Sequence, residues 1–132
     1  MTEGEWSRVL DASALLAWLR EEPGAEVVEE CLSGSFVSAV NLSEVMQKSL
    51  AGGVEISGLV EDLVALGISF VAFGAEQAVV AAELWPSTRP LGLSLADRAC
   101  LATAVGLGLP ALTADRSWAE IEWEGLSVET IR

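Results

Sequence analysis

The chain has 132 residues, 52% of them hydrophobic, and its 20 Asp and Glu against 7 Lys and Arg give a formal net charge of −13. A chain of this length and composition can build a hydrophobic core without disulfide or metal cross-links. The high hydrophobic fraction also excludes an intrinsically disordered acidic protein. The chain contains no His, which excludes Ser-His-Asp and Cys-His nucleophiles, imidazole acid–base chemistry and His-ligated zinc. Any enzymatic chemistry must therefore use carboxylates, hydroxyls, Arg and a metal ion held by carboxylates.

In the first half of the chain, apolar residues at strand or helix spacing alternate with turn residues. A short strand ends at Asp11, and Pro23 stops the helix that follows it. A second strand leads to a helix that begins at Asn41 and that Gly52-Gly53 ends. In chain order we predict a strand at residues 9–10, helices at 14–19 and 24–32, a strand at 36–40, and helices at 41–50 and 56–64.

The second half continues this alternation. Residues 68–73 form a continuous apolar run, which predicts a strand in a sheet that is covered on both faces. Residues 86–93 are predicted to be irregular and lead to Ser94, a candidate helix N-cap. In chain order we predict a strand at 68–73, a helix at 75–85, a helix from 94 to about 105, a strand at 110–113, a turn at 115–118 and an edge strand at 126–131.

The order of these elements predicts the fold class. Strands separated by helices give right-handed crossovers and a parallel sheet between helical layers. We therefore predict one domain over residues 1–132, an α/β three-layer α/β/α sandwich with a central, mostly parallel sheet of four to five strands. Such sheets bind ligands outside the carboxyl ends of their strands, so the functional site is expected at that edge.

Four carboxylates from separate segments are expected at this edge. Asp11 ends the first strand and Asp115 follows the strand at 110–113, while Glu44 and Asp97 lie one turn inside helices that start there. Two unit charges about 5 Å apart repel by about 3 kcal/mol at an effective dielectric near 20. A cluster of carboxylates therefore favours a bound cation, and oxygen ligands suit Mg²⁺ or Mn²⁺.

Each of these carboxylates also has a purely structural interpretation. Asn41 with Glu44, and Ser94 with Asp97, fit capping boxes that stabilise a helix start by about 1 kcal/mol. Asp115 could cap the short turn before Trp118, and Asp11 with Ser13 could cap the first helix. The joint placement of all four favours the metal site over four independent caps.

Hydroxyl, Arg and Trp side chains near the carboxylates are candidate auxiliary groups. Ser13 and Thr113 could hold a water or phosphate oxygen, or only bond the local backbone. Arg98 and Arg116 are candidate phosphate contacts at the rim, or solvated surface charges. Trp118 is the one Trp considered for base stacking.

Four segments resemble, in order and approximate spacing, the PIN domains, particularly the VapC-like toxins of bacterial toxin–antitoxin pairs. The resemblance spans nearly the whole chain, and the Asp97 helix followed by Thr113-Ala-Asp115 is its most specific part. The four segments are residues 9–16, 41–45, 93–104 and 112–118.

The resemblance implies an endoribonuclease that depends on Mg²⁺ or Mn²⁺, a homodimer, and inhibition by a small cognate antitoxin. It assigns the acidic site residues to Asp11, Glu44, Asp97 and Asp115. Many family members carry a further acidic residue where this chain has Ser117, and this departure weakens the expectation of a second metal ion.

The net charge and the apolar residues of the first two helices suggest how such a protein would bind RNA and an antitoxin. RNA is expected to bind chiefly through the metal, with Arg98, Arg116 and Arg89 as phosphate contacts, because the net charge opposes binding elsewhere. A basic or Arg-bearing antitoxin segment suits the acidic protein. The apolar residues of the first two helices are expected either to fill the core or to form part of a groove for a partner helix. These residues are Leu15, Leu16, Trp18, Leu19, Val27 and Val28.

The N-terminal residues, the uncharged stretches and the cysteines predict where the protein is located. Residues 1–8 carry acidic residues where a signal peptide needs basic ones, and the longest uncharged stretch is too short to span a bilayer. Two Cys suggest reduced thiols. We therefore expect a cytoplasmic protein without a membrane anchor.

The alternatives to a ribonuclease are an inactive PIN-like binding module and a Mg²⁺-binding receiver-like domain, although the sole Lys, Lys48, is misplaced for a receiver. A haloacid-dehalogenase-like phosphatase would need an Asp-x-Asp where this chain has Asp11-Ala12-Ser13.

Overall fold

The computed structural model of the chain describes residues 7–132; residues 1–6, which include most of the acidic start discussed above, lie outside the described residues. The strands are β1 (Val9–Leu10), β2 (Phe36–Ser38), β3 (Ser69–Val71), β4 (Ala111–Thr113) and β5 (Val128–Thr130). The helices are α2 (Ala12–Leu19), α3 (Ala25–Cys31), α4 (Ala39–Ala51), α5 (Leu59–Ala65), α6 (Ala75–Glu83), α7 (Trp85–Thr88) and α8 (Leu95–Leu107), with 3₁₀ helices η1 (Arg89–Leu91) and η2 (Arg116–Glu120).

The strands form one parallel sheet in the order β3-β2-β1-β4-β5, which confirms the predicted sheet. The chain moves outward from β1 to β2 and β3, and then returns to the other side of β1 with β4. The strand order therefore reverses between β1 and β4, the position at which open α/β sheets bind ligands. Asp11 directly follows β1, and Asp115 lies two residues beyond β4.

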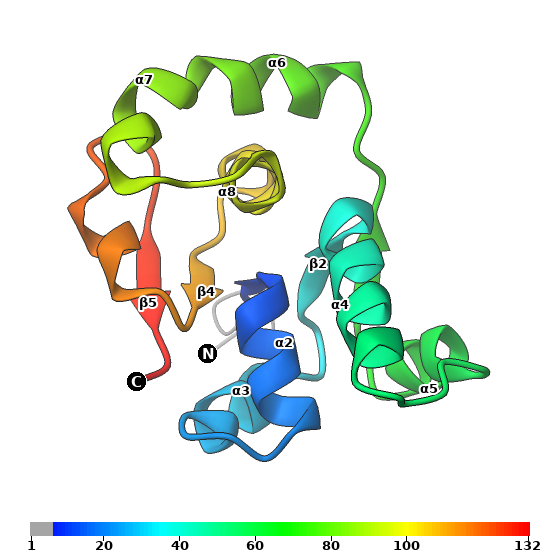
Figure 1. Cartoon of the computed structure of the whole chain (residues 1–132). Helices are drawn as coiled ribbons and strands as arrows, with labels where there is room; N and C mark the ends of the chain where they lie inside the picture. The colour runs from blue at the N-terminus through cyan, green and yellow to red at the C-terminus, as the bar shows by residue number, and fades with distance from the viewer. Residues whose placement is uncertain (1–6) are drawn as a thin grey trace.

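Alternating side chains of the short strands separate two hydrophobic cores. Leu10 and Leu112 belong to the core with α2, α3, α4 and α5, whereas Val9 and Ala111 belong to the core with α6, α8 and η2. Figure 1 shows the same layers, with α6 to α8 on one side of the sheet and α2 to α5 on the other. The predicted three-layer α/β/α sandwich is confirmed.

The bounds of several predicted elements shift by one to three residues, and three predicted segments differ further in their extent or type. The strand predicted at 36–40 ends at Ser38, because the Ser38 hydroxyl accepts a hydrogen bond from the Val40 N–H and α4 begins at Ala39. Residues 86–93, predicted to be irregular, largely form α7 and η1, each with Pro in its first turn, where no helical N–H is lost. The strand predicted at 68–73 is shorter, Ser69–Val71, and lies at the edge of the sheet, where its residues are exposed or half-buried. Helices cover both faces of the sheet, as the apolar run indicated.

Within residues 7–132, no helix is both long and apolar enough to cross a bilayer. Cys31 and Cys100 are free, as expected. Burial raises the pKa of the Cys100 thiol well above its usual range, so this thiol stays protonated and packs as an apolar group.

Candidate functional site

Asp11 is buried at the edge of the sheet, where β1 ends. Its Oδ1 accepts the Ala14 backbone N–H at 2.8 Å and so caps α2. The Ser13 hydroxyl lies 2.7 and 2.9 Å from the two carboxylate oxygens, and Thr113 Oγ1 on β4 donates to Oδ2 at 2.6 Å. Ser13 Oγ also accepts the Ala114 N–H at 2.9 Å. The two hydroxyls therefore orient Asp11 and join the end of β1 to the end of β4.

Burial dominates the electrostatics of this carboxyl group. Desolvation raises the pKa of Asp11 from 3.8 to about 6, the hydrogen bonds from Thr113, Ala14 and Ser13 oppose this rise, and the charge of Asp97 adds to it. A cation beside the carboxylate would favour the ionised form and lower the pKa. A buried carboxyl group with a raised pKa beside a second carboxylate is typical of functional sites.

Glu44 is positioned by Asn41, one turn earlier on α4. Asn41 is fully buried, and its Nδ2 donates to Glu44 Oε1 at 2.9 Å and to the Ala96 carbonyl of α8 at 3.0 Å. The predicted capping box at Asn41 is wrong, because the helix starts at Ala39 with Ser38 as its N-cap. The Asn41 amide instead links α4 to the first turn of α8 and fixes Glu44 beside it.

Asp97 and Asp115 both cap helices, as their structural interpretations predicted. Asp97 forms the capping box with Ser94: its Oδ2 accepts the Ser94 N–H at 2.9 Å, and its own N–H donates to Ser94 Oγ at 3.1 Å. Asp115 starts η2, where its Oδ1 accepts the Ser117 N–H at 2.9 Å and the Ser117 hydroxyl at 2.8 Å. Ser117, at the position of the missing acidic residue, therefore holds Asp115.

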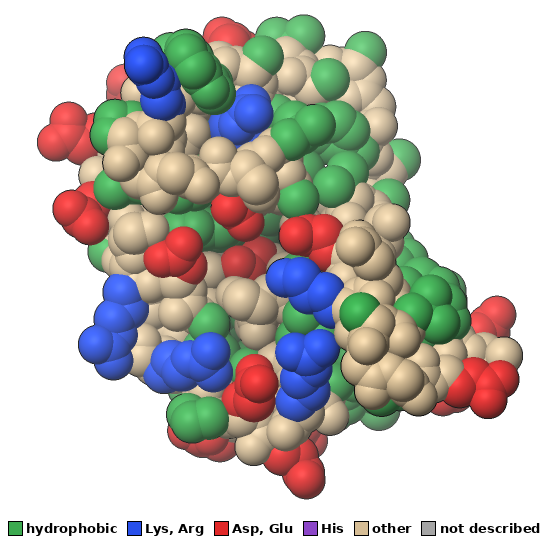
Figure 2. Space-filling view, viewed as in Figure 1, with side chains coloured by type: hydrophobic (Ala, Val, Ile, Leu, Met, Phe, Trp, Pro, Cys, Tyr) green, Lys and Arg blue, Asp and Glu red, His purple; other side chains and the backbone are tan. Residues whose placement is uncertain are grey.

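Asp11, Glu44 and Asp97 lie near one another around an acidic cleft at the carboxyl edge of the sheet, and Asp115 follows the neighbouring strand β4. The charges of Asp11, Asp97 and Glu44 all act on the buried Cys100 thiol, and Asp97 acts on Asp11. Figure 2 shows acidic side chains gathered around a hollow in the middle of this face, with Lys and Arg side chains below it. Within residues 7–132, no three His, Cys, Asp or Glu side chains are close enough to form a ready-made metal cluster.

Three of these carboxylates keep one oxygen outside the hydrogen bonds of the described chain. Glu44 Oε1, Asp97 Oδ2 and Asp115 Oδ1 are engaged locally, which leaves the other oxygen of each without a partner in residues 7–132. Each carboxylate is thus fixed by one oxygen and presents the second. Hard oxygen donors of this kind fit Mg²⁺ or Mn²⁺, so the donor set fits the predicted metal, although its binding stays a prediction.

The two candidate Arg residues occupy different environments. Arg98 is half-buried and its Nη1 donates to the Ala81 carbonyl at 2.8 Å, which ties α8 to α6. Arg116 is exposed and its Nε donates to the Arg132 carbonyl at 2.9 Å. Their contacts with RNA stay predictions, and the guanidinium of Arg98 already has a structural role.

Trp118 does not lie on the surface. It is 1% exposed and belongs to the core between the sheet and α8, so the base-stacking interpretation of this residue is wrong. The exposed aromatic side chain in this half of the chain is Trp85, over which the Arg89 guanidinium lies at 5.2 Å from the ring centroid.

The comparison with protein families decides the assignment. A family model described as PIN domain matches residues 8–124. The chain belongs to the PIN domain family. The resemblance predicted from the four segments is confirmed, and a receiver or a dehalogenase-like phosphatase is excluded. No curated protein sequence matches the chain.

Solved structures share this PIN domain fold. A toxin–antitoxin complex from Klebsiella pneumoniae aligns with a TM-score of 0.74 at 19% identity, covering 95% of this chain and 98% of that chain. VapBC-1 from nontypeable Haemophilus influenzae gives 0.68 at 13% identity, covering 95% and 98%, and FitAcB from Neisseria gonorrhoeae gives 0.66 at 20%, covering 93% and 96%. At these low identities, the TM-scores show a shared fold.

Proposed function

We propose that this PIN domain is a divalent-metal-dependent endoribonuclease and the toxin of a toxin–antitoxin pair. The observation that supports the proposal most is that Asp11, Asp97 and Glu44, from three segments of a chain without His, lie near one another at the carboxyl edge of the sheet, with Asp115 just beyond the neighbouring strand β4. The solved structures with this fold include toxin–antitoxin complexes, which favours the same role here.

Each residue of the cleft has a distinct part in this proposal. Asp11 and Asp97 are the first candidates to hold the metal, and Glu44 and Asp115 complete the set as ligands or by holding water. Ser13 and Thr113 keep Asp11 in place through the hydrogen bonds described above.

The metal would be Mg²⁺ or Mn²⁺. When bound, it supplies Lewis-acid chemistry that lowers the pKa of water and offsets negative charge on the phosphodiester. The chain itself orients the carboxylates, excludes bulk water around Asp11 and provides no imidazole base. We expect single-stranded or otherwise accessible RNA to be the substrate, because the deep A-form major groove of long duplexes hides the bases.

The test is incubation of the purified, partner-free protein with total RNA, with and without Mg²⁺ or Mn²⁺. Cleavage should require the metal and stop in EDTA. Asp11→Asn and Asp97→Asn should each lower the cleavage rate by at least about 100-fold, or roughly 2.7 kcal/mol in activation free energy. Asp62→Asn, an exposed aspartate on α5, is the matched control and should cleave normally.

Two results would contradict this proposal. Cleavage that persists in EDTA, or that survives both Asn substitutions, would exclude the carboxylate–metal mechanism. A folded wild-type protein that cleaves no RNA with either metal would instead support the inactive PIN-like binding module.

The antitoxin is proposed to dock between α2 and α3. A pocket of about 470 Å³ there is lined by Trp18, Leu19, Ala25, Glu21 and Glu29, and the Trp18 indole N–H donates to the Glu29 carboxylate. An apolar surface with two carboxylates and no cation suits an amphipathic segment that carries Arg or Lys. Of the residues expected for such a groove, Leu15, Leu16 and Val28 are buried in the core.

This assignment is tested by capture of the product of the adjacent small open reading frame. Ala25→Glu should weaken capture by overfilling the pocket while leaving RNA cleavage unchanged. Capture at wild-type strength would place the antitoxin elsewhere.

A homodimer is proposed through the outer face of α4. Leu42, Met46 and Leu50 line a groove of about 360 Å³ on this helix, and Leu50 is 56% exposed. Apolar side chains at successive turns of one exposed face are typical of an interface. Light scattering should give a dimer for wild type and a monomer for Leu50→Glu; a monomeric wild type would contradict the proposal.

A further inference from the structure

The Lys and Arg side chains of this acidic protein differ in whether they contact another residue. Within residues 7–132, five of its seven Lys and Arg side chains contact another residue: Arg8, Arg89, Arg98, Arg116 and Arg132. Arg20 and Lys48 are both exposed, and neither side chain makes a hydrogen bond or an ion pair with another described residue.

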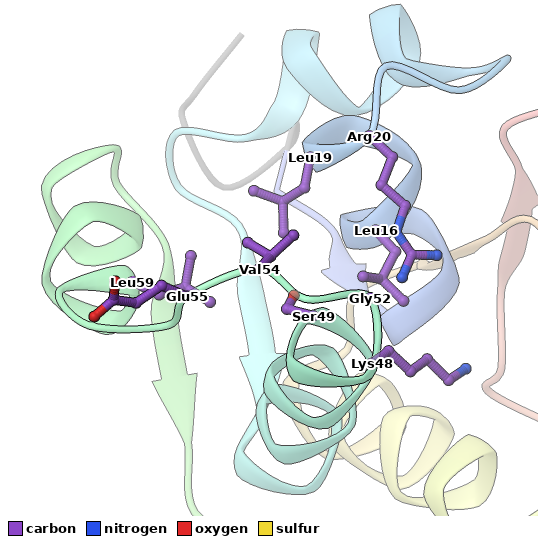
Figure 3. A pocket seen from close by; sticks show the side chains of 9 residues that line it. All are labelled: Leu16, Leu19, Arg20, Lys48, Ser49, Gly52, Val54, Glu55 and Leu59. Carbon is purple, nitrogen blue, oxygen red and sulfur yellow. The ribbon is translucent and has the colours of Figure 1, made fainter.

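Both of these unengaged cations line the same pocket. It has a volume of about 350 Å³, lies between α2 and the end of α4, and is lined with apolar side chains that include Leu16, Leu19 and Val54. Figure 3 shows Leu19 and Val54 pointing toward one another, with Arg20 and Lys48 on one side of them and Glu55 on the other. The pocket thus combines an apolar interior with a cationic end.

The pocket lies about one helix length from the acidic cleft. Lys48 lies four residues after Glu44 on α4, and side chains at this spacing are neighbours about 5–6 Å apart on one helix face. Arg20 is the C-cap of α2, whose N-cap is Asp11, so the two ends of this eight-residue helix are about 12 Å apart. A nucleic-acid strand bound at the cleft would reach both cations within one or two nucleotides.

We propose that this pocket binds a nucleotide of the RNA substrate next to the cleaved bond, with its phosphate between Arg20 and Lys48 and its base against the apolar side chains. The inference rests on the proposed ribonuclease function. An RNA phosphate fits two cations that have no partner among residues 7–132, and the apolar side chains offer a surface against which a base can be buried. Because the net charge of −13 repels RNA elsewhere, these contacts supply local attraction that the rest of the surface opposes.

The test measures binding of a fluorescein-labelled, mixed-sequence single-stranded RNA by fluorescence anisotropy in EDTA over a series of KCl concentrations. Without metal no cleavage is expected, and the phosphate contacts of the chain dominate. Arg20→Gln and Lys48→Gln should each weaken binding several-fold and reduce the slope of log affinity against log salt by about 0.7, the double variant by about 1.4. Val54→Glu, at a 59% exposed position, should weaken binding by placing a carboxylate in the pocket.

The control is Arg8→Gln, which removes the same charge outside the pocket, directly before β1, where Arg8 pairs with Glu129; it should leave affinity and slope unchanged. Unchanged RNA binding by the double variant and Val54→Glu would overturn the proposal. So would a double variant that keeps RNA binding but no longer captures the antitoxin, because the pocket would then bind protein. Loss of RNA binding with no metal-dependent cleavage by wild type would support the pocket and contradict the nuclease.

Discussion

Two neighbouring regions on α2 and α4 differ in both charge and organisation. In the acidic cleft, Asp11 and Glu44 are held by buried hydroxyl and amide groups. About one helix length away, Arg20 and Lys48 are exposed and unengaged within the described chain. The carboxylates are therefore preorganised at an energetic cost, whereas the exposed cations carry no such cost. This difference is what we expect between residues that hold a reacting group and residues that attract a substrate.

The largest expected effect concerns the cost of charge at Asp11. Its pKa in the folded state, about 6, exceeds the ordinary 3.8, so the folded protein binds this proton more tightly than the unfolded chain. The resulting stabilisation is complete below pH 3.8 and is lost as the pH rises through about 6, a difference of roughly 3 kcal/mol. In metal-free buffer at about pH 7.5, Asp11→Asn should therefore be more stable than wild type. This gain in stability should be smaller near pH 4, where Asp11 is protonated in the folded wild type.

Urea unfolding across this pH range measures the difference between the two proteins. Asp62→Asn serves as the control, since this aspartate is exposed on α5. An Asp11→Asn protein whose stability relative to wild type does not change with pH would show that the cleft carries no such cost.

A bound metal ion should offset the loss of stability that ionised Asp11 causes in the wild type. Mn²⁺ at about 100 times its dissociation constant should stabilise the folded state by roughly 2.7 kcal/mol and raise the melting temperature. Asp97→Asn should lose most of this gain, whereas Lys48→Gln should keep it. An equal rise in wild type and Asp97→Asn would place the metal outside the cleft.

A smaller effect is expected from the residue that fixes Glu44. Asn41→Leu removes both hydrogen bonds to Glu44 and Ala96, and loss of such an outer support weakens metal affinity by about 10-fold. Mn²⁺ titration calorimetry at a temperature where the variant is folded measures this, with Ser43→Ala on the exposed side of α4 as control. Wild-type affinity in Asn41→Leu would reduce Asn41 to a structural link between helices.

The smallest effect should come from the cations. Arg20→Gln and Lys48→Gln should change the free energy of unfolding by less than about 0.5 kcal/mol, because exposed side chains without partners contribute little to stability. Urea unfolding of both variants at neutral pH checks this. A loss of more than about 1 kcal/mol would mean that these cations support the fold, and the contrast with the cleft would disappear.

The sequence by itself determined the features that depend on short stretches of chain. Apolar spacing and turn residues predicted the order of strands and helices, and the Ser94 to Asp97 spacing predicted a capping box that the structure contains. The parallel sheet followed from that order, and with it the expected edge for Asp11 and Asp115. Helix caps and crossover topology follow from local geometry, so one sequence is sufficient to predict them.

Only the tertiary structure decided which side chains are covered and by what. Asn41 resembled a helix cap but is buried between α4 and α8, and Trp118 resembled a surface platform but fills the core. A signal for Asn41 was present, since a polar residue on the apolar side of a helix needs a buried partner. The presence of Arg20 and Lys48 in one pocket had no such signal, because residues 28 positions apart come to line the same pocket only through the packing of α2 against α4. Burial and proximity depend on contacts between distant segments, which periodicity along the chain does not contain.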